Sequence, residues 1–350
     1  MEIAGRPIGD GAPTYVIAEL SANHQHSFEA AVRLVEAAAD AGADAIKLQT
    51  YTADTITIDS ERPEFRIASG TVWDGRTLHD LYTEAATPWE WHEPLQRAAT
   101  DHGMHFFSSP FDDSAVEFLD RLGVPAFKIA SFEIVDMALI GRVARTGRPM
   151  IISTGMATLD EVTEAVATAR ENGARELALL KCTSAYPAPP EEANLCTIPA
   201  MATRFSAPVG LSDHTLGIAV PVAAVALGAV IVEKHLTLSR GDGGPDAGFS
   251  LEPSELREMV AAIRVTEKAL GSVSYEPTER ESPSRILRRS LFVVEPVRAG
   301  ETFTEHNVRS IRPGQGLHTR HLHEVLGARA ARDVERGTPM HWGLIANRTD

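Results

Sequence analysis

Short apolar runs alternate with helical stretches through the first two thirds of the chain, and this alternation constrains the fold more than any other feature. Such runs are typical of strands that are buried in a parallel sheet and joined by helices. The eight runs are Tyr15–Ala18, Ala45–Leu48, Met104–Ser108, Ala126–Ala130, Met150–Ser153, Leu177–Leu180, Val209–Leu211 and Val230–Glu233. A doubly wound sheet rarely needs eight even units, and the chain has no GxGxxG motif. We therefore predict an α/β fold of the TIM (β/α)8 barrel type.

Amphipathic segments connect these runs, as a barrel requires. Ser27 and Thr158 precede two of the segments and are residue types that cap helix N-termini. Gly42 and Gly123 follow two of them and are typical of helix C-termini. The expected helices include Ser27–Ala41, Asp113–Leu122, Leu159–Asn172, Leu216–Leu227 and a closing helix over Glu252–Leu270.

Two stretches interrupt the repeat. Residues 51–92 follow the second run and are too long for an ordinary connection, so we predict that they form a lid or a rim. The second interruption is Arg240–Phe249, a Gly-rich loop after the eighth run.

The composition changes after the closing helix. Residues 272–285 are polar and contain two prolines, which is typical of a linker. Short strand-like runs separated by turn residues follow, as in SLFVVEPVRAGE. We predict a barrel domain over residues 1–271, a linker over 272–285 and a small β-rich domain over 286–350.

The charge and cysteine content exclude several classes of protein. The net charge of −15 disfavours binding to nucleic acid or to an anionic membrane, because both require a basic surface. Two cysteines are too few for a secreted disulfide framework. The N-terminus has no apolar signal segment, and the longest apolar stretch, Ile218–Val232, is short for a membrane span. We expect a cytoplasmic protein.

Two lysines stand among polar residues at the ends of predicted strands. Lys47 and Lys128 each follow apolar residues, and Ser/Thr hydroxyls end the neighbouring runs. The carboxyl ends of barrel strands meet at one mouth, where such groups would form a pocket for phosphate and carboxylate. Two alternatives are lysines that merely reach solvent and a lysine that forms a Schiff base, as in aldolase barrels.

Two histidines end consecutive predicted strands. His214 and His235 should therefore point into the same mouth, where neutral imidazoles can hold a divalent metal ion. With open positions for water and a substrate oxygen, the ion would act as a Lewis acid. Our first choice is Mn²⁺, with Mg²⁺ or Co²⁺ as alternatives. The competing interpretation is a pair of hydrogen-bonding histidines in a polar cleft.

Several carboxylates accompany these residues. Glu19 and Glu133, at the ends of the first and fourth strands, are candidates for general acid–base chemistry or for contacts to sugar hydroxyls. Glu233 and Asp213 adjoin the histidines, so we expect them to orient the imidazoles. Asp246, in the Gly-rich loop, is a candidate sugar contact. For each of these, a solvated charge at the rim is the simple alternative.

The motifs resemble the sialic acid synthase family when taken together and in order. They are VIAELSANH, KLQTYT, FSSPF, FKIASFE, STGMA, LLKCTSAYP, GLSDHT and EKHLTL. The C-terminal RSLFVVEPVRAGETFTEHNVRSIRPGQG is similar to that family's antifreeze-like (SAF) domain. The resemblance covers nearly the whole chain.

Within the family, the chain is most similar to pseudaminic acid synthases. The SANH loop, LQTYTADT and GRTLHDLYTEAATPWEWHE are typical of that branch. Ser184 stands where sialic acid synthases usually have Asn, which disfavours N-acetylmannosamine as the substrate. The resemblance implies a transferase that condenses phosphoenolpyruvate with 2,4-diacetamido-2,4,6-trideoxy-L-altrose and releases phosphate by C–O cleavage.

The resemblance also assigns roles by position. Glu19 matches the catalytic glutamate, and His214 and His235 match the two metal ligands. Arg312 matches an arginine that one subunit's SAF domain places in its partner's barrel, so a domain-swapped homodimer is implied. Contacts to phosphoenolpyruvate or sugar are implied for Lys47, Lys128, Ser131, Glu133, Ser153, Tyr186, Ser212 and Asp246.

Other functions remain open from the sequence. An N-acetylneuraminate or legionaminate synthase would run the same reaction on a different sugar. A Schiff-base pyruvate aldolase is the main rival among enzymes. A non-catalytic binding protein is the rival from another class, because antifreeze-like domains alone suggest binding.

Overall fold

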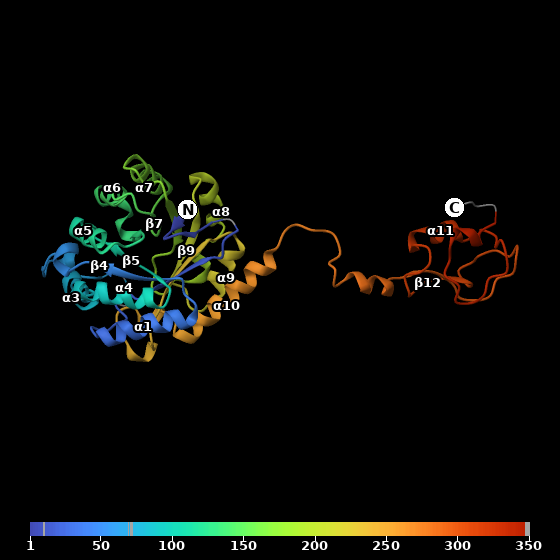
Figure 1. Ribbon diagram of the computed structural model, residues 1–350, viewed down its shortest axis with the longest axis horizontal. Coiled ribbons are helices and arrows are strands. Elements are labelled where there is room, and N and C mark those ends of the chain that lie inside the picture. Colours follow the sequence, from blue (N-terminus) through green and yellow to red (C-terminus); the bar gives the residue numbers. More distant parts are fainter. Residues whose placement is uncertain (10, 69, 71–72, 347–350) are drawn as a thin grey trace. The chain divides into compact units, whose positions relative to one another are not determined.

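The computed structural model describes residues 1–9, 11–68, 70 and 73–346. The chain divides into two compact units, Met1–Gly271 and Ser272–Asp350. Each unit is drawn in Figure 1 and is considered separately below. Residues 69 and 71–72 of the predicted lid or rim, and residues 347–350 of the predicted C-terminal domain, lie outside the described residues.

The first unit is built on a closed barrel of parallel strands, in the order β10-β3-β4-β5-β6-β7-β8-β9. Each predicted run overlaps one barrel strand, which confirms the predicted fold class. The strands are β3 (Tyr15–Glu19), β4 (Ala45–Thr50), β5 (His105–Pro110), β6 (Phe127–Ile129), β7 (Met150–Ser153), β8 (Leu177–Cys182), β9 (Val209–Asp213) and β10 (Ile231–His235). A short N-terminal hairpin of β1 (Glu2–Ile3) and β2 (Arg6–Pro7) precedes them.

Helices surround the barrel and pack their apolar faces against its strands (Figure 1). They are α1 (Phe28–Ala41), α4 (His92–Asp101), α5 (Asp113–Leu122), α6 (Met137–Ala144), α7 (Leu159–Glu171), α8 (Thr197–Phe205), α9 (Ala219–Ala226) and α10 (Pro253–Leu270). The predicted caps are present, since Ser27 accepts from the Ala30 amide and Thr158 from the Glu161 amide. Helix α9 begins three residues later than predicted, because Gly217, at φ +74°, and its neighbours stay in the loop that carries His214.

One glycine is required by the close approach of two barrel strands. A Cβ at Gly210 in β9 would collide with the Ile231 carbonyl oxygen of β10 and lie 2.6 Å from the Ile231 Cβ. Glycine therefore lets β9 and β10 close the barrel at the point where both strands carry site residues.

The stretch 51–92 contains two short helices, α2 (Ala53–Ile56) and α3 (Leu78–Ala85). Between them in the chain lies Trp73, whose indole N–H donates to the Pro245 carbonyl at 3.1 Å. Pro245 belongs to the Gly-rich loop after β10, so part of this stretch lies at the rim of the barrel's carboxyl end.

The second unit contains a small antiparallel sheet, as the sequence predicts. Strand β11 (Ser290–Val293) pairs with β12 (Val308–Ile311), and the short helix α11 (Leu322–Val325) follows. Its own apolar core includes Leu291, Phe303 and Leu344. Among the described residues, no helix of either unit is both long and apolar enough to cross a membrane.

Candidate active site

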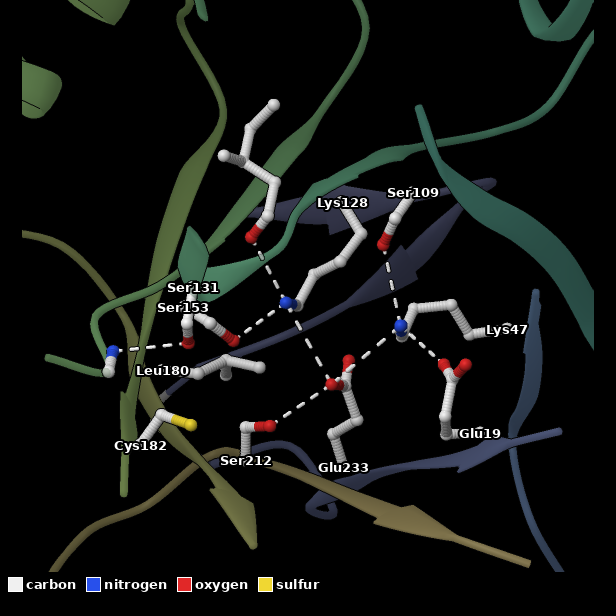
Figure 2. Close-up of polar contacts among 12 residues, drawn as sticks. Glu19, Lys47, Ser109, Lys128, Ser131, Ser153, Leu180, Cys182, Ser212 and Glu233 are labelled. Atoms are coloured by element: carbon white, nitrogen blue, oxygen red, sulfur yellow. Dashed lines mark hydrogen bonds and ion pairs between the residues drawn. The ribbon is translucent and has the colours of Figure 1, made fainter. Parts of the chain in front are cut away.

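Alternation along the barrel strands selects which side chains face the interior. In β4, Lys47 and Gln49 share one face, while Ile46 and Leu48 are buried on the other. The same rule places Lys128 of β6 and Glu233 of β10 inside the barrel. Figure 2 shows these two lysines converging on one carboxylate.

Glu233 lies between two buried ammonium groups. Its Oε1 is 3.9 Å from Lys47 Nζ and 3.8 Å from Lys128 Nζ, and it accepts a 3.1 Å hydrogen bond from Ser212 (Figure 2). Burial alone would raise the pKa of Glu233, but the two ammonium groups outweigh burial and lower that pKa. Glu233 therefore stays ionised and neutralises part of the positive charge inside the barrel.

Glu19 forms a second ion pair with Lys47 and is fully buried at the end of β3. Burial raises the pKa of Glu19, and the nearby Lys47 only partly opposes this effect. The other carboxylate oxygen accepts from the Ser21 amide at 3.1 Å and from Gln49 at 3.3 Å. Glu19 is thus held in place and retains its proton more tightly than a solvated carboxyl would, which suits a general acid–base.

The two lysines differ in their surroundings. Burial would lower the pKa of Lys47, but the carboxylates of Glu19 and Glu233 prevail and raise it. For Lys128, burial prevails over Glu233 and lowers the pKa. Lys128 donates to Ser153 Oγ at 2.6 Å and to the Ile129 carbonyl at 3.1 Å, and these contacts aim its ammonium group into the barrel.

Ser131 and Ser184 lie against the backbone of Gly155. The Gly155 amide donates to Ser131 Oγ at 3.1 Å. A Cβ at Gly155 would lie 2.7 Å from Ser131 Oγ and collide with Ser184 Oγ. Only glycine therefore allows the loop after β7 to meet the ends of β6 and β8.

His214 and His235 lie side by side, with ring centroids 5.2 Å apart. His214 Nδ1 donates to the Thr183 carbonyl at 2.9 Å. Burial alone would lower the pKa of His214, but the Cys182 thiol and this carbonyl prevail and raise it. Burial and the adjacent His214 lower the pKa of His235 well below its usual value, which keeps that imidazole neutral. His235 Nδ1 is buried and has no hydrogen-bond partner among the described residues.

The unpartnered Nδ1 of His235 and the adjacent ring of His214 fit a divalent metal ion held by two imidazoles. Within the described part of the chain, no group of three or more His, Cys, Asp or Glu residues is arranged to enclose an ion. The remaining ligands would therefore come from water and a substrate oxygen, as in a metal site that keeps positions open for chemistry.

The remaining predicted contacts lie around this centre or outside it. Glu133 follows β6, and burial raises its pKa to about 7. Tyr186 packs its ring 4.5 Å from that of His214. Asp246 is half-buried, and its carboxylate accepts from the Ser21 hydroxyl and, at 3.5 Å, from the Ala22 amide. Arg312 lies in the second unit, directly after β12.

Asp213 and Glu233 do not orient the histidines as expected. Glu233 faces the two lysines, as described above. Asp213 instead pairs with Lys234, which is fully buried and also donates to the Thr215 carbonyl. These two residues are directly paired in the β9–β10 register, on the opposite face of the strands from His214 and His235.

Sequence reasoning missed three residues of the site. Gln49 donates to Glu19, a contact that the period of two along β4 could have suggested. Phe249 packs 5.0 Å from the His235 ring, and only the fold brings the end of the Gly-rich loop there. The Cys182 thiol lies 3.9 Å from His214 Nδ1; burial alone would raise its pKa, but His214 prevails and lowers it to about 7.

Comparisons with known proteins cover nearly all of the chain. A model described as the NeuB family matches residues 34–275, and the SAF domain matches residues 288–346. A pseudaminic acid synthase of Campylobacter jejuni is 44% identical, over 92% of this chain and 94% of that protein. An N,N'-diacetyllegionaminic acid synthase of Legionella pneumophila is 35% identical, over 97% of each. The solved structure of the Bacillus subtilis spore coat polysaccharide biosynthesis protein SpsE is similar, with TM-score 0.67, 36% identity and coverage of 100% and 99%.

Breaking the Asp213–Lys234 pair should destabilise the strands that carry the histidines. We expect Lys234→Met to lower the free energy of unfolding by about 3–5 kcal/mol, because it leaves a buried carboxylate without its partner. Chemical denaturation monitored by circular dichroism measures this change. The double variant Lys234→Met/Asp213→Asn should be more stable than Lys234→Met; equal or lower stability would contradict the role of the unpaired charge.

Proposed function

The chain belongs to the NeuB family and is an enzyme that makes a nonulosonic acid, a nine-carbon acidic sugar, and we propose that its product is pseudaminic acid. In the proposed reaction, phosphoenolpyruvate condenses with 2,4-diacetamido-2,4,6-trideoxy-L-altrose and phosphate leaves by C–O cleavage. The higher identity to a pseudaminic acid synthase than to a legionaminic acid synthase supports this choice of sugar.

The observation that carries the proposal is that two buried lysines, Lys47 and Lys128, lie near two adjacent histidines, His214 and His235. The positive charges of Lys47 and Lys128 help to lower the pKa of His235, so both lysines lie near that imidazole. An anionic substrate with a phosphate and a carboxylate needs concentrated positive charge, and an aldehyde needs a group that polarises its oxygen. The two lysines would meet the first requirement, and an ion held by the two histidines would meet the second.

The phosphoenolpyruvate end is formed by charged groups that are in place before the substrate arrives. Glu233 lies between the two lysines and offsets their positive charge. Ser153 and Ser212 already contact this network, and their hydroxyls supply further hydrogen bonds to phosphate or carboxylate. In the proposed reaction, Glu19 orients the water molecule that adds to the enol carbon of phosphoenolpyruvate. Glu19 also takes part in the transfer of that water's proton.

The sugar end is formed by Glu133, Tyr186 and Asp246. Glu133 Oε2 is buried and has no hydrogen-bond partner among the described residues, so it is available to a hydroxyl or an acetamido N–H. Its pKa of about 7 lets it act as a donor when protonated and as an acceptor when ionised.

His214 and His235 would hold a divalent ion, and Mn²⁺ is our proposal. When bound, the ion supplies a Lewis acid that makes the aldehyde carbon more electrophilic. The protein's part is to hold the His214 ring through the Thr183 carbonyl and to keep the His235 imidazole neutral through burial.

The proposed specificity predicts a clear order of substrates. Phosphate release from phosphoenolpyruvate should be fastest with the diacetamido altrose, with kcat/KM at least about 10-fold above that for the legionaminate precursor or N-acetylmannosamine. A coupled phosphate assay on the three sugars measures this. A higher kcat/KM with either of the other sugars would overturn the choice of substrate but not the reaction class.

Two further arms of this assay check the chemistry. With ¹⁸O in the bridging position of phosphoenolpyruvate, the label should leave in phosphate; label in the sugar acid would exclude C–O cleavage.

The lowered pKa of Lys128 favours a neutral amine, which is what a Schiff-base aldolase needs. Borohydride with pyruvate should nevertheless leave the protein mass unchanged, and a trapped adduct would favour the aldolase.

The metal proposal predicts a reversible loss of activity. Chelation and dialysis should abolish turnover, and Mn²⁺ should restore it. His235→Ala should be inactive at all metal concentrations while its circular dichroism spectrum stays that of the wild type. Turnover by carefully chelated protein, measured alongside its metal content, would contradict a metal role.

We also propose that the protein is a domain-swapped homodimer that acts in the cytoplasm, in which Arg312 completes the partner's site. Large apolar side chains are exposed on the loops that follow β6, β7 and β9, at the carboxyl end of the barrel, and a partner surface would remove them from water. They are Phe132, Val135, Met156, Leu159 and Leu216.

A mixing experiment tests this arrangement. His235→Ala and Arg312→Ala should each be inactive alone. Co-expressed, they should recover about one quarter of wild-type activity, because half of the dimers are mixed and each has one intact site. If Arg312 serves the barrel of its own chain, each chain of a mixed dimer keeps one defect and no activity returns.

A further inference from the structure

Trp73 joins the stretch 51–92 to two other loops at the barrel mouth. Its indole N–H donates to the Pro245 carbonyl at 3.1 Å, in the Gly-rich loop. Its ring lies 5.3 Å from the ring of Tyr186, in the loop after β8. Trp73 is half-buried, so part of the residue is exposed.

A series of aromatic rings leads from Trp73 to the histidines. The Tyr186 ring is 4.5 Å from His214 and 5.1 Å from Phe249, and Phe249 is 5.0 Å from His235. Trp73 is therefore separated from the imidazoles by one ring. A sugar whose aldehyde lies at the histidines can extend along this series and bring its far end toward Trp73.

The chemistry of Trp73 distinguishes it from the rest of the site. An indole has a single donor and no acceptor, and Pro245 already takes that donor. The exposed part of the ring thus offers apolar surface and no hydrogen bond. A methyl group packs well on such a surface, whereas a hydroxyl placed there loses its water without a replacement partner.

We propose that Trp73 is a specificity-determining residue that selects a sugar carrying a methyl group, rather than a hydroxymethyl group, at the end remote from the aldehyde. This inference rests on the proposed function and goes beyond it, because it assigns the recognition of carbon 6 to one side chain. The loop contacts of Gln25 with the Asp242 and Gly243 carbonyls hold the Gly-rich loop, and thereby Pro245, in position.

The test uses two sugars that differ only at carbon 6. They are the 6-deoxy diacetamido altrose and its 6-hydroxy counterpart. For wild-type protein, kcat/KM should favour the 6-deoxy sugar by about 10- to 100-fold. Trp73→Ala should reduce this ratio roughly tenfold, whereas Trp73→Phe should largely keep it, because phenylalanine retains the apolar surface. The KM for phosphoenolpyruvate should not change.

Trp89→Phe is the matched control. Trp89 belongs to the same stretch, and its indole also donates to a backbone carbonyl, that of Tyr51, at 3.3 Å. It packs on Phe118 of α5 instead of Tyr186. Its replacement should leave the ratio of the two sugars unchanged.

Equal losses for both sugars in Trp73→Ala would overturn the proposal, because they would indicate a purely structural role. The same holds if Trp89→Phe changes the ratio as much. If the wild-type protein turns over neither sugar, the proposed function itself fails. In that case the ratio of dissociation constants for the two sugars, measured by calorimetry on the wild type and Trp73→Ala, still decides the role of Trp73.

Discussion

The candidate site depends on the compensation of charge around Glu233. Two ammonium groups buried inside a barrel would repel each other and would each favour the neutral form. The Glu233 carboxylate, 3.9 Å from Lys47 and 3.8 Å from Lys128, opposes both effects and makes their burial tolerable. The same arrangement leaves the interior nearly neutral, so an anionic substrate must displace or share these contacts. Binding energy is then available where phosphate and carboxylate meet the lysines, and nowhere else in the described interior is positive charge so concentrated.

Strands β9 and β10 carry this arrangement on two faces. On the inner face they present His214, Glu233 and His235. On the outer face, Asp213 and Lys234 form a buried ion pair at directly opposed positions of the register. A slip of one residue would exchange the faces and expel the site residues from the barrel. The outer pair opposes such a slip, because Asp213 and Lys234 would each lose the opposite charge. Gly210 permits the close contact between β9 and Ile231 of β10 on which the register depends.

The sequence predicted much of this structure because apolar runs and polar strand ends are both local features of the chain. The apolar runs marked all eight strands, and the places of Lys47 and Lys128 at strand ends predicted that they meet at one mouth. Pairings between distant segments were not predictable in this way. Glu233 adjoins His235 in the chain through Lys234, which suggested that it orients the imidazole, yet it turns to lysines from β4 and β6. The sequence suggested Asp246 as a sugar contact, but not that Ser21 and Ala22, from another loop, would donate to its carboxylate. The late start of α9 has a local cause, the positive φ of Gly217.

The two ends of the site follow different physical rules. At the lysine end, selectivity depends on charge, and any molecule with phosphate and carboxylate groups at the right separation is attracted. At the aromatic end, Tyr186, Phe249 and Trp73 provide few hydrogen bonds, so discrimination there depends on the cost of removing water from a hydroxyl. Glu133 differs from both ends, because its carboxyl group can donate or accept a hydrogen bond near neutral pH. A barrel that conserves its strand-end charges can therefore change its sugar by altering loop residues, because the loops, unlike the strands, do not set the register on which the charges depend.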